Sequence, residues 1–219
     1  MTEQSGPRFL RLFPLQSVVL FPGMELPLVV FEPRYLQLTS ECKEADEPFG
    51  VVLLREGREV GDQEAEPHDV GTTAHILSVT TLGEGRLSVT TVGGRRFKVQ
   101  SLGHEHPYLS ADVDYLDDDT AESADPSLIA DVKGEAAAFV RAMLALRGGY
   151  VRSVPFPDDA TVLSYQIAQL FQGNADIQQK LLETPTADRL GDELDLIKSA
   201  MQQINRQQRR GRGLSFSSN

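Results

Sequence analysis

The sequence lacks most of the features that disulfides, metals or membranes require. Its single cysteine, Cys42, excludes an internal disulfide and a cysteine-ligated zinc site, and its position on a predicted helix indicates a small buried thiol. No stretch approaches the roughly 20 apolar residues of a membrane span, and Met1–Arg8 lacks the apolar region of a signal peptide. We therefore expect a cytoplasmic protein with no membrane partner.

Catalytic motifs are also missing. There is no Gly-x-Ser-x-Gly elbow, no phosphate loop ending in Gly-Lys-Ser/Thr and no His-Glu-x-x-His helix. Gly83-Glu84-Gly85 lacks the third glycine of a dinucleotide fingerprint and indicates a hairpin turn instead. His104 and His106 would point the same way on an extended segment, as two metal ligands must, but no third ligand is evident. We predict no enzyme, no cofactor and no metal.

Acidic residues far outnumber basic residues outside the C-terminal end. The chain carries a net charge of −11, and residues 1–205 carry −15, because four arginines follow Asn205. They are Arg206, Arg209, Arg210 and Arg212. An acidic body repels phosphate backbones, which disfavours nucleic acid as the partner of the folded part.

The sequence does contain a long, nearly continuous apolar stretch, Leu12–Tyr35. Three of its prolines, Pro14, Pro22 and Pro27, exclude one continuous helix and predict short strands separated by turns. Pro22-Gly23 predicts a type II turn. That turn would reverse the chain between strands at Val18–Phe21 and Met24–Phe31.

A helix is predicted to follow, with Pro33 in its first turn. Tyr35, Leu36, Leu38 and Cys42 would form its apolar face. The next apolar run, Phe49–Leu54, predicts a strand that is buried on both faces and central in its sheet. A charged loop, residues 56–69, is predicted after it.

Alternating apolar and polar residues predict further strands up to residue 116. Gly83–Gly85 and Gly93-Gly94 are predicted to be their hairpin turns, which indicates a closed or nearly closed antiparallel barrel. The acidic segment 117–125 predicts a linker. Residues 1–8 are predicted to be flexible.

Helical periodicity begins after the linker. Four helices with short connections predict a four-helix bundle over residues 126–206, and the basic tail 207–219 is predicted to be disordered. The last helix carries apolar residues at four-three spacing, which favours packing in the bundle and permits a weak homodimer. These residues are Leu190, Leu194, Ile197, Met201 and Ile204.

Several segments, in this order, resemble the amino-terminal, substrate-binding domain of Lon proteases. The most specific are Leu-Phe-Pro-Leu, Phe-Pro-Gly, Leu-Pro-Leu and Phe-Glu-Pro-Arg-Tyr, between Leu12 and Tyr35. Further matches occur near Arg96, Tyr108 and Arg189, so that the resemblance covers roughly Phe9–Ile204. It implies an α+β fold in which residues 9–116 form a PUA-like β pseudo-barrel with one helix, followed by the helical bundle. The ATPase and serine–lysine peptidase modules of a full protease have no counterpart in the sequence.

The candidate binding residues are Phe31, Glu32, Arg34, Tyr35, Arg96 and Tyr108. One interpretation is structural: Glu32 caps the helix and pairs with Arg95 or Arg96. The other is a groove with apolar walls, in which an extended polypeptide pairs along an exposed strand edge. We expect Phe31 to be buried and Tyr35 to lie at the wet edge of the apolar cluster.

The leading functional hypothesis is a non-catalytic module that binds unfolded or degradation-bound polypeptide, or a protease or chaperone partner. The alternative is RNA binding through the Arg/Gly-rich tail, since PUA-like folds are named for an RNA-binding family. A monomer or a weak homodimer is compatible with either.

Overall fold

The computed structural model describes residues 8–55, 66–118 and 124–214, with side chains described up to Arg206. The chain divides into two compact units, residues 1–117 with 168–183, and residues 118–167 with 184–219. Residues 1–7 of the predicted flexible N-terminus, most of the predicted loop at 56–69 and most of the predicted linker lie outside the described residues, whereas Arg8 lies in a strand. Among the described helices, none combines the length and the apolarity needed to cross a membrane.

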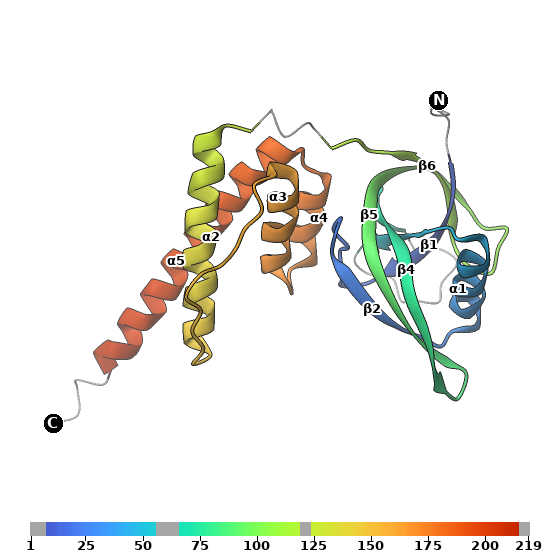
Figure 1. Cartoon of the computed structure of the whole chain (residues 1–219), viewed down its shortest axis with the longest axis horizontal. Coiled ribbons are helices and arrows are strands. Elements are labelled where there is room, and N and C mark those ends of the chain that lie inside the picture. Colours follow the sequence, from blue (N-terminus) through green and yellow to red (C-terminus); the bar gives the residue numbers. More distant parts are fainter. Residues whose placement is uncertain (1–7, 56–65, 119–123, 215–219) are drawn as a thin grey trace. The chain divides into compact units, whose positions relative to one another are not determined.

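The first unit is built on a six-stranded sheet in the order β2-β5-β4-β3-β1-β6 (Figure 1). Its strands are β1 (Arg8–Leu15), β2 (Glu25–Val30), β3 (Phe49–Leu53), β4 (Val70–Gly83), β5 (Arg86–Gly103) and β6 (Ser110–Tyr115). The long strand β5 also pairs with β6, which closes a ring of β1, β3, β4, β5 and β6. Strand β2 extends the sheet from β5, and among the described strands β5 is its one partner.

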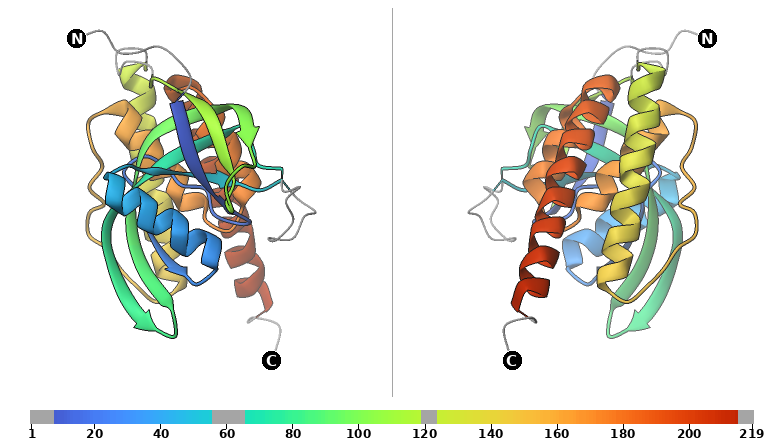
Figure 2. Two further views of the ribbon diagram at one scale, coloured as in Figure 1. Left: turned by 90° about the vertical axis from the view of Figure 1, so that its right-hand side faces the viewer. Right: turned by 90° about the vertical axis from the view of Figure 1, so that its left-hand side faces the viewer.

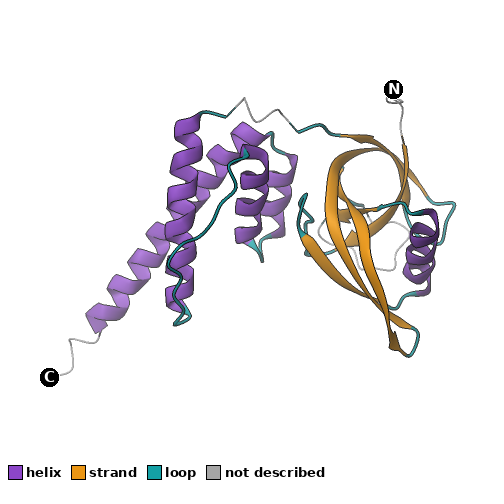
Figure 3. Cartoon of the chain, in the orientation of Figure 1, coloured by secondary structure: helices purple, strands orange, loops and turns teal. Residues whose placement is uncertain are grey.

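The sheet is mixed, so the prediction of a purely antiparallel barrel was wrong. Strands β1 and β3 pair in parallel, with Leu12 opposite Gly50 and Leu15 opposite Leu53. A parallel pair needs a crossover connection, and the segment between these strands supplies one that contains β2 and helix α1 (Pro33–Ala45). Figure 3 shows α1 as the helix beside the strands of this unit.

Two apolar clusters form the core of the sheet unit. The larger one joins β2, β3 and the inner face of α1, where Tyr35, Leu38 and Cys42 are buried. The smaller one surrounds Phe97, and Gly50 and Gly71 make room for its ring, because a Cβ at either glycine would come within 2.7 Å of it. Strand β3 is buried along its whole length, which confirms the prediction of a central strand.

The turn at Pro22-Gly23 is confirmed, but its predicted strand partner is not. The Met24 N–H donates to the Phe21 carbonyl at 3.0 Å, and Gly23 has a φ of 74°. Residues 18–21 form no strand, although residues 19–21 are buried, and β2 pairs with β5 instead.

Gly93-Gly94 is not a hairpin turn either, because both residues lie within β5. A Cβ at Gly93 would lie 2.1 Å from the Phe21 carbonyl oxygen. The pair of glycines therefore marks a close crossing of two backbones, a role that the sequence pattern does not distinguish from a turn. The other predicted turn, at Gly83–Gly85, does connect β4 to β5.

The four predicted helices after the sheet are present as α2 (Pro126–Leu146), α3 (Ala160–Ala168), α4 (Ala175–Glu183) and α5 (Thr186–Leu214). A short 3-10 helix, η2 (Gln169–Phe171), follows α3. Helices α2 and α5 pack along one another in the second unit, as both views of Figure 2 show. Helix α5 runs past the predicted tail boundary at residue 207, because arginine and glutamine are good helix formers and no proline interrupts them.

The predicted four-helix bundle needs correction, because α4 belongs to the sheet unit. The Gln179 side-chain amide donates to the Val70 carbonyl at 3.0 Å, and the Arg96 guanidinium donates to the Leu182 carbonyl at 2.7 Å. These bonds satisfy polar groups of α4 and of the sheet, so residues 168–183 group with the strands rather than with α2 and α5.

Candidate functional site

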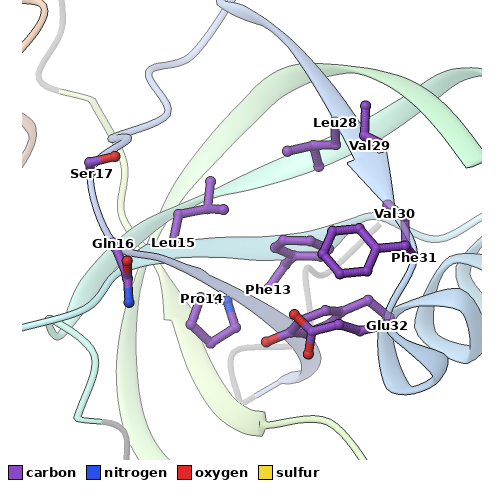
Figure 4. A pocket seen from close by; sticks show the side chains of 11 residues that line it. Phe13, Pro14, Leu15, Gln16, Ser17, Leu28, Val29, Val30, Phe31 and Glu32 are labelled. Atoms are coloured by element: carbon purple, nitrogen blue, oxygen red, sulfur yellow. The ribbon is translucent and has the colours of Figure 1, made fainter. Parts of the chain in front are cut away.

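A cavity of about 310 Å³ opens in the sheet unit between the end of β1 and strand β2. It is lined by Phe13, Pro14, Leu15, Gln16, Ser17, Leu28, Val29, Val30, Phe31, Glu32 and Tyr35. The cavity exists because the two strands diverge: residues 12–15 of β1 pair with β3, whereas β2 pairs with β5. Side chains from both strands line the space between them (Figure 4).

Aromatic rings form the inner wall of the cavity. Phe13 stacks on Tyr35 with ring centroids 4.2 Å apart, and Phe49 packs against Phe13 at 5.8 Å. Tyr35 is 6% exposed, so our expectation that it lies at the wet edge was wrong. Its burial raises the pKa of its phenol. The helical spacing of α1 turns Tyr35 toward the strands together with Leu38, which explains the burial.

The rim of the cavity carries exposed apolar side chains. Phe31 is 62% exposed and Val29 is 57% exposed, so the prediction that Phe31 is buried was also wrong. The reason is the alternation of β2, in which Leu26 and Val30 point into the core. Phe31 follows directly after this strand, and Figure 4 shows its ring reaching toward that of Phe13.

Glu32 and Arg34 form an ion pair beside the rim. The shortest distance between the Arg34 guanidinium and the Glu32 carboxylate is 2.7 Å, and the guanidinium also lies 4.7 Å from the centre of the Tyr35 ring. Glu32 occupies the N-cap position of α1, but its side chain makes no capping hydrogen bond. Because it pairs with Arg34, the predicted pairing with Arg95 or Arg96 is wrong; Arg95 pairs with Asp117 instead.

The two other candidates, Arg96 and Tyr108, do not line this cavity. Arg96 is buried and donates to α4, as described above. Tyr108 is buried, donates its hydroxyl to Glu41 and stacks on His106 with ring centroids 5.2 Å apart. The structure therefore places Phe31, Glu32 and Tyr35 at the cavity and Arg34 beside it.

Glu41 is the centre of a polar cluster on the outside of α1. It accepts hydrogen bonds from Tyr108, Gln37 and Arg11, and these bonds lower its pKa to about 2. Arg11 also pairs with Glu47 at 3.0 Å. Every member has a partner, so the cluster fixes α1 against β1 and offers no unpaired group to a ligand.

The described part of the chain contains no cluster of metal ligands and no reactive thiol. His, Cys, Asp and Glu side chains nowhere gather in threes that could hold a metal ion there, and His106 stacks on Tyr108. Cys42 is buried as predicted, and burial raises the pKa of its thiol to about 11. At neutral pH this cysteine is a protonated core residue.

Sequence reasoning missed the residues of β1 and β2 that complete the cavity, notably Phe13, Leu28 and Val29. A signal was available at Pro27, since a proline inside a strand is typical of an edge strand. An edge strand followed by a helix leaves apolar side chains at the border of the sheet, where a cavity can form.

Known proteins are similar to the chain in sequence and in structure. The Lon protease of Anaeromyxobacter dehalogenans is 32% identical over 84% of this chain and 22% of its own length. Lon protease 2 of Myxococcus xanthus is 30% identical over 55% of this chain and 15% of its own length. The chain thus spans less than a quarter of these two relatives.

A solved structure shares both sequence and fold with the chain. The Lon N-terminal domain protein from Xanthomonas campestris has a TM-score of 0.66 and 26% identity, over 86% of this chain and 98% of its own. The family described as the ATP-dependent protease La (LON) substrate-binding domain matches residues 10–199, which include every residue that lines the cavity. The chain belongs to this family of Lon substrate-binding domains.

Proposed function

We propose that the chain is a non-catalytic module that recognises polypeptide, and that the cavity between β1 and β2 is its binding site. The observation that carries this proposal is the exposure of Phe31 and Val29 at the rim of a cavity that is lined mostly by apolar residues. Large apolar side chains on a surface cost solvation free energy unless a partner covers them. Family membership supports polypeptide as that partner.

The chemistry of the lining supports binding without catalysis. Of the described residues that line the cavity, Glu32 alone is charged, and Arg34 neutralises it. The exposed wall is divided almost evenly between polar and apolar surface, so it offers hydrogen-bonding atoms beside apolar area, which suits recognition of a polypeptide. The RNA alternative rests on residues 207–219, whose side chains lie outside the described part, and nothing at the cavity favours it.

The test is a titration of a labelled, permanently unfolded polypeptide with the wild type and with Phe31→Ala. Burying a phenylalanine contributes about 1.5–3 kcal/mol, so the variant should bind roughly tenfold to a hundredfold more weakly. Leu82→Ala is the matched control, because Leu82 is 49% exposed at the β4–β5 turn, outside the cavity lining. Raising the salt concentration should leave the affinity nearly unchanged, since apolar contacts carry it.

Two results would contradict the proposal. One is the absence of saturable binding by the wild type. The other is an equal affinity of wild type and Phe31→Ala, which would remove the cavity from the site.

A further inference from the structure

Strand β2 leaves one backbone edge without a strand partner next to the cavity. Among the described strands it pairs with β5 alone, from Glu25 opposite Val92 to Val30 opposite Leu87. Its residues Leu28, Val29 and Val30 line the cavity. The unpaired edge and the apolar cavity are therefore continuous.

The alternation of β2 decides which backbone groups face that edge. The Gly93 N–H donates to the Met24 carbonyl at 2.8 Å, so Met24 faces β5. In an antiparallel ladder every second residue faces the same neighbour, which directs the backbone groups of Leu26, Leu28 and Val30 to β5 as well. Pro27 and Val29 then face the opposite edge.

Pro27 supports this assignment independently. Proline has no N–H to donate, and within sheets it is found where its nitrogen faces away from the neighbouring strand. Val29 is two residues further and has the same orientation, with an N–H that proline lacks. The edge beside the cavity therefore presents the N–H and the carbonyl of Val29.

We infer that the substrate binds by strand addition, pairing its backbone with Val29 on β2 while an alternate side chain enters the cavity beside Phe31. This inference rests on the proposed function and specifies its substrate: an extended segment with apolar residues at every second position. Pro27 limits the pairing to a short segment, because it offers a carbonyl and no donor.

The net charge of the protein further limits which polypeptide segments can bind. The protein carries a net charge of −11, and the cavity lining adds no basic side chain. An acidic segment would be repelled by the body of the protein, so the complementary occupant is an uncharged or basic apolar segment.

The test uses a fluorescein-labelled peptide of nine residues, with alternating valine and threonine and a lysine at each end. Val29→Pro removes the edge N–H without removing a bond to β5, and Val29→Ala is the matched control that keeps this N–H. Val29→Pro should bind the peptide about tenfold more weakly than Val29→Ala, the effect of one backbone hydrogen bond. Equal affinities of the two variants would overturn strand addition.

A second measurement needs no variant and covers the case that Val29→Pro fails to fold. Single N-methyl groups are placed along the peptide and each peptide is titrated with the wild type. Strand addition predicts that methylation weakens binding at alternate positions, where the N–H faces β2. A uniform effect, or none, would overturn the inference.

The outcomes separate the inference from the proposed function. If Phe31→Ala weakens binding and neither Val29→Pro nor methylation shows the expected pattern, the cavity binds polypeptide in another way. If sedimentation shows a dimer that Val29→Pro dissociates, and no peptide binds, a second copy of the chain occupies the edge and the inference is overturned.

Discussion

The sequence predicts a buried Phe31 and a partly exposed Tyr35, and the structure shows the opposite. Both are aromatic residues in one short motif, and both were candidates for the site. In the structure Tyr35 forms the inner wall and Phe31 the exposed rim. A variant at Tyr35 therefore tests the fold, and a variant at Phe31 tests binding.

Tyr35→Ala should destabilise the sheet unit by about 3–5 kcal/mol, because it removes a buried ring and its stacking on Phe13. Urea unfolding followed by circular dichroism measures this free energy. Phe31→Ala serves as the control and should cost less than about 1 kcal/mol, since its side chain is largely in water. A small loss at Tyr35 would mean that the ring is not part of the core.

At the scale of the element, helix α5 carries a buried carboxyl group. Glu193 is fully buried, and within the described residues neither of its oxygens has a hydrogen-bond partner. Burial raises its pKa well above the usual value; Arg189 acts against this shift, and Asp192 adds to it. Arg189 itself donates to Ser164 and Thr186.

The raised pKa predicts that the helical unit loses stability as the pH rises. The folded state holds the proton of Glu193 more tightly than the unfolded state does. The resulting stabilisation is complete below the ordinary pKa of about 4.5 and is lost as the pH rises toward the folded-state pKa. The variant Glu193→Gln, which cannot ionise, is the control for this effect.

Urea midpoints of the wild type and Glu193→Gln, measured from pH 4 to pH 9, check this prediction. The variant should gain stability relative to the wild type as the pH rises. Parallel curves would show that the carboxyl group is not buried as the structure places it.

The sequence predicts elements better than it predicts their partners. Helix α1, the buried strand β3 and all four later helices follow from local periodicity and from proline and glycine signals. The pairing of β2 with β5 joins residues about 60 positions apart, and no local signal specifies it. The crossing at Gly93 and the docking of α4 are missed for the same reason.

The candidate site was partly predictable. The opening apolar stretch identified Phe31, Glu32 and Tyr35, since their motif also carries the family resemblance. It did not specify which side chain is exposed, because that depends on where β2 ends and α1 begins. Arg96 and Tyr108 matched the resemblance but contribute hydrogen bonds within the fold instead.

On the scale of the whole molecule, the sheet unit is discontinuous. It combines residues 1–117 with residues 168–183, and the chain passes between the two units three times. If the chain is divided in the acidic linker and the two pieces are separated, α4 is therefore lost from the strands that it covers. The two sides of the linker therefore do not correspond to the two compact units, because the sheet unit takes residues from both sides.

We predict that a fragment of residues 1–117 is less stable than the sheet unit in the whole chain. It lacks the Leu182 carbonyl that accepts from buried Arg96, and the loss of a hydrogen bond to a charged group costs about 1.5–3 kcal/mol. Urea unfolding of the fragment, alone and with a synthetic peptide of residues 168–183, measures the effect. The peptide should raise the midpoint. Equal midpoints for the fragment and the whole chain would show that α4 contributes nothing to the sheet unit.

The discontinuity also sets an order of events on the ribosome. The strands are complete once residue 117 has emerged, but α4 emerges only after residues 118–183 have been synthesised, which takes about 3–13 s at about 5–20 residues per second. During that interval the side of the sheet that α4 will cover faces solvent, and the hydrogen bond from the Arg96 guanidinium to the Leu182 carbonyl has not yet formed. The nascent chain is then most exposed to chaperones and to aggregation, and slow translation between residues 118 and 183 would prolong that exposure.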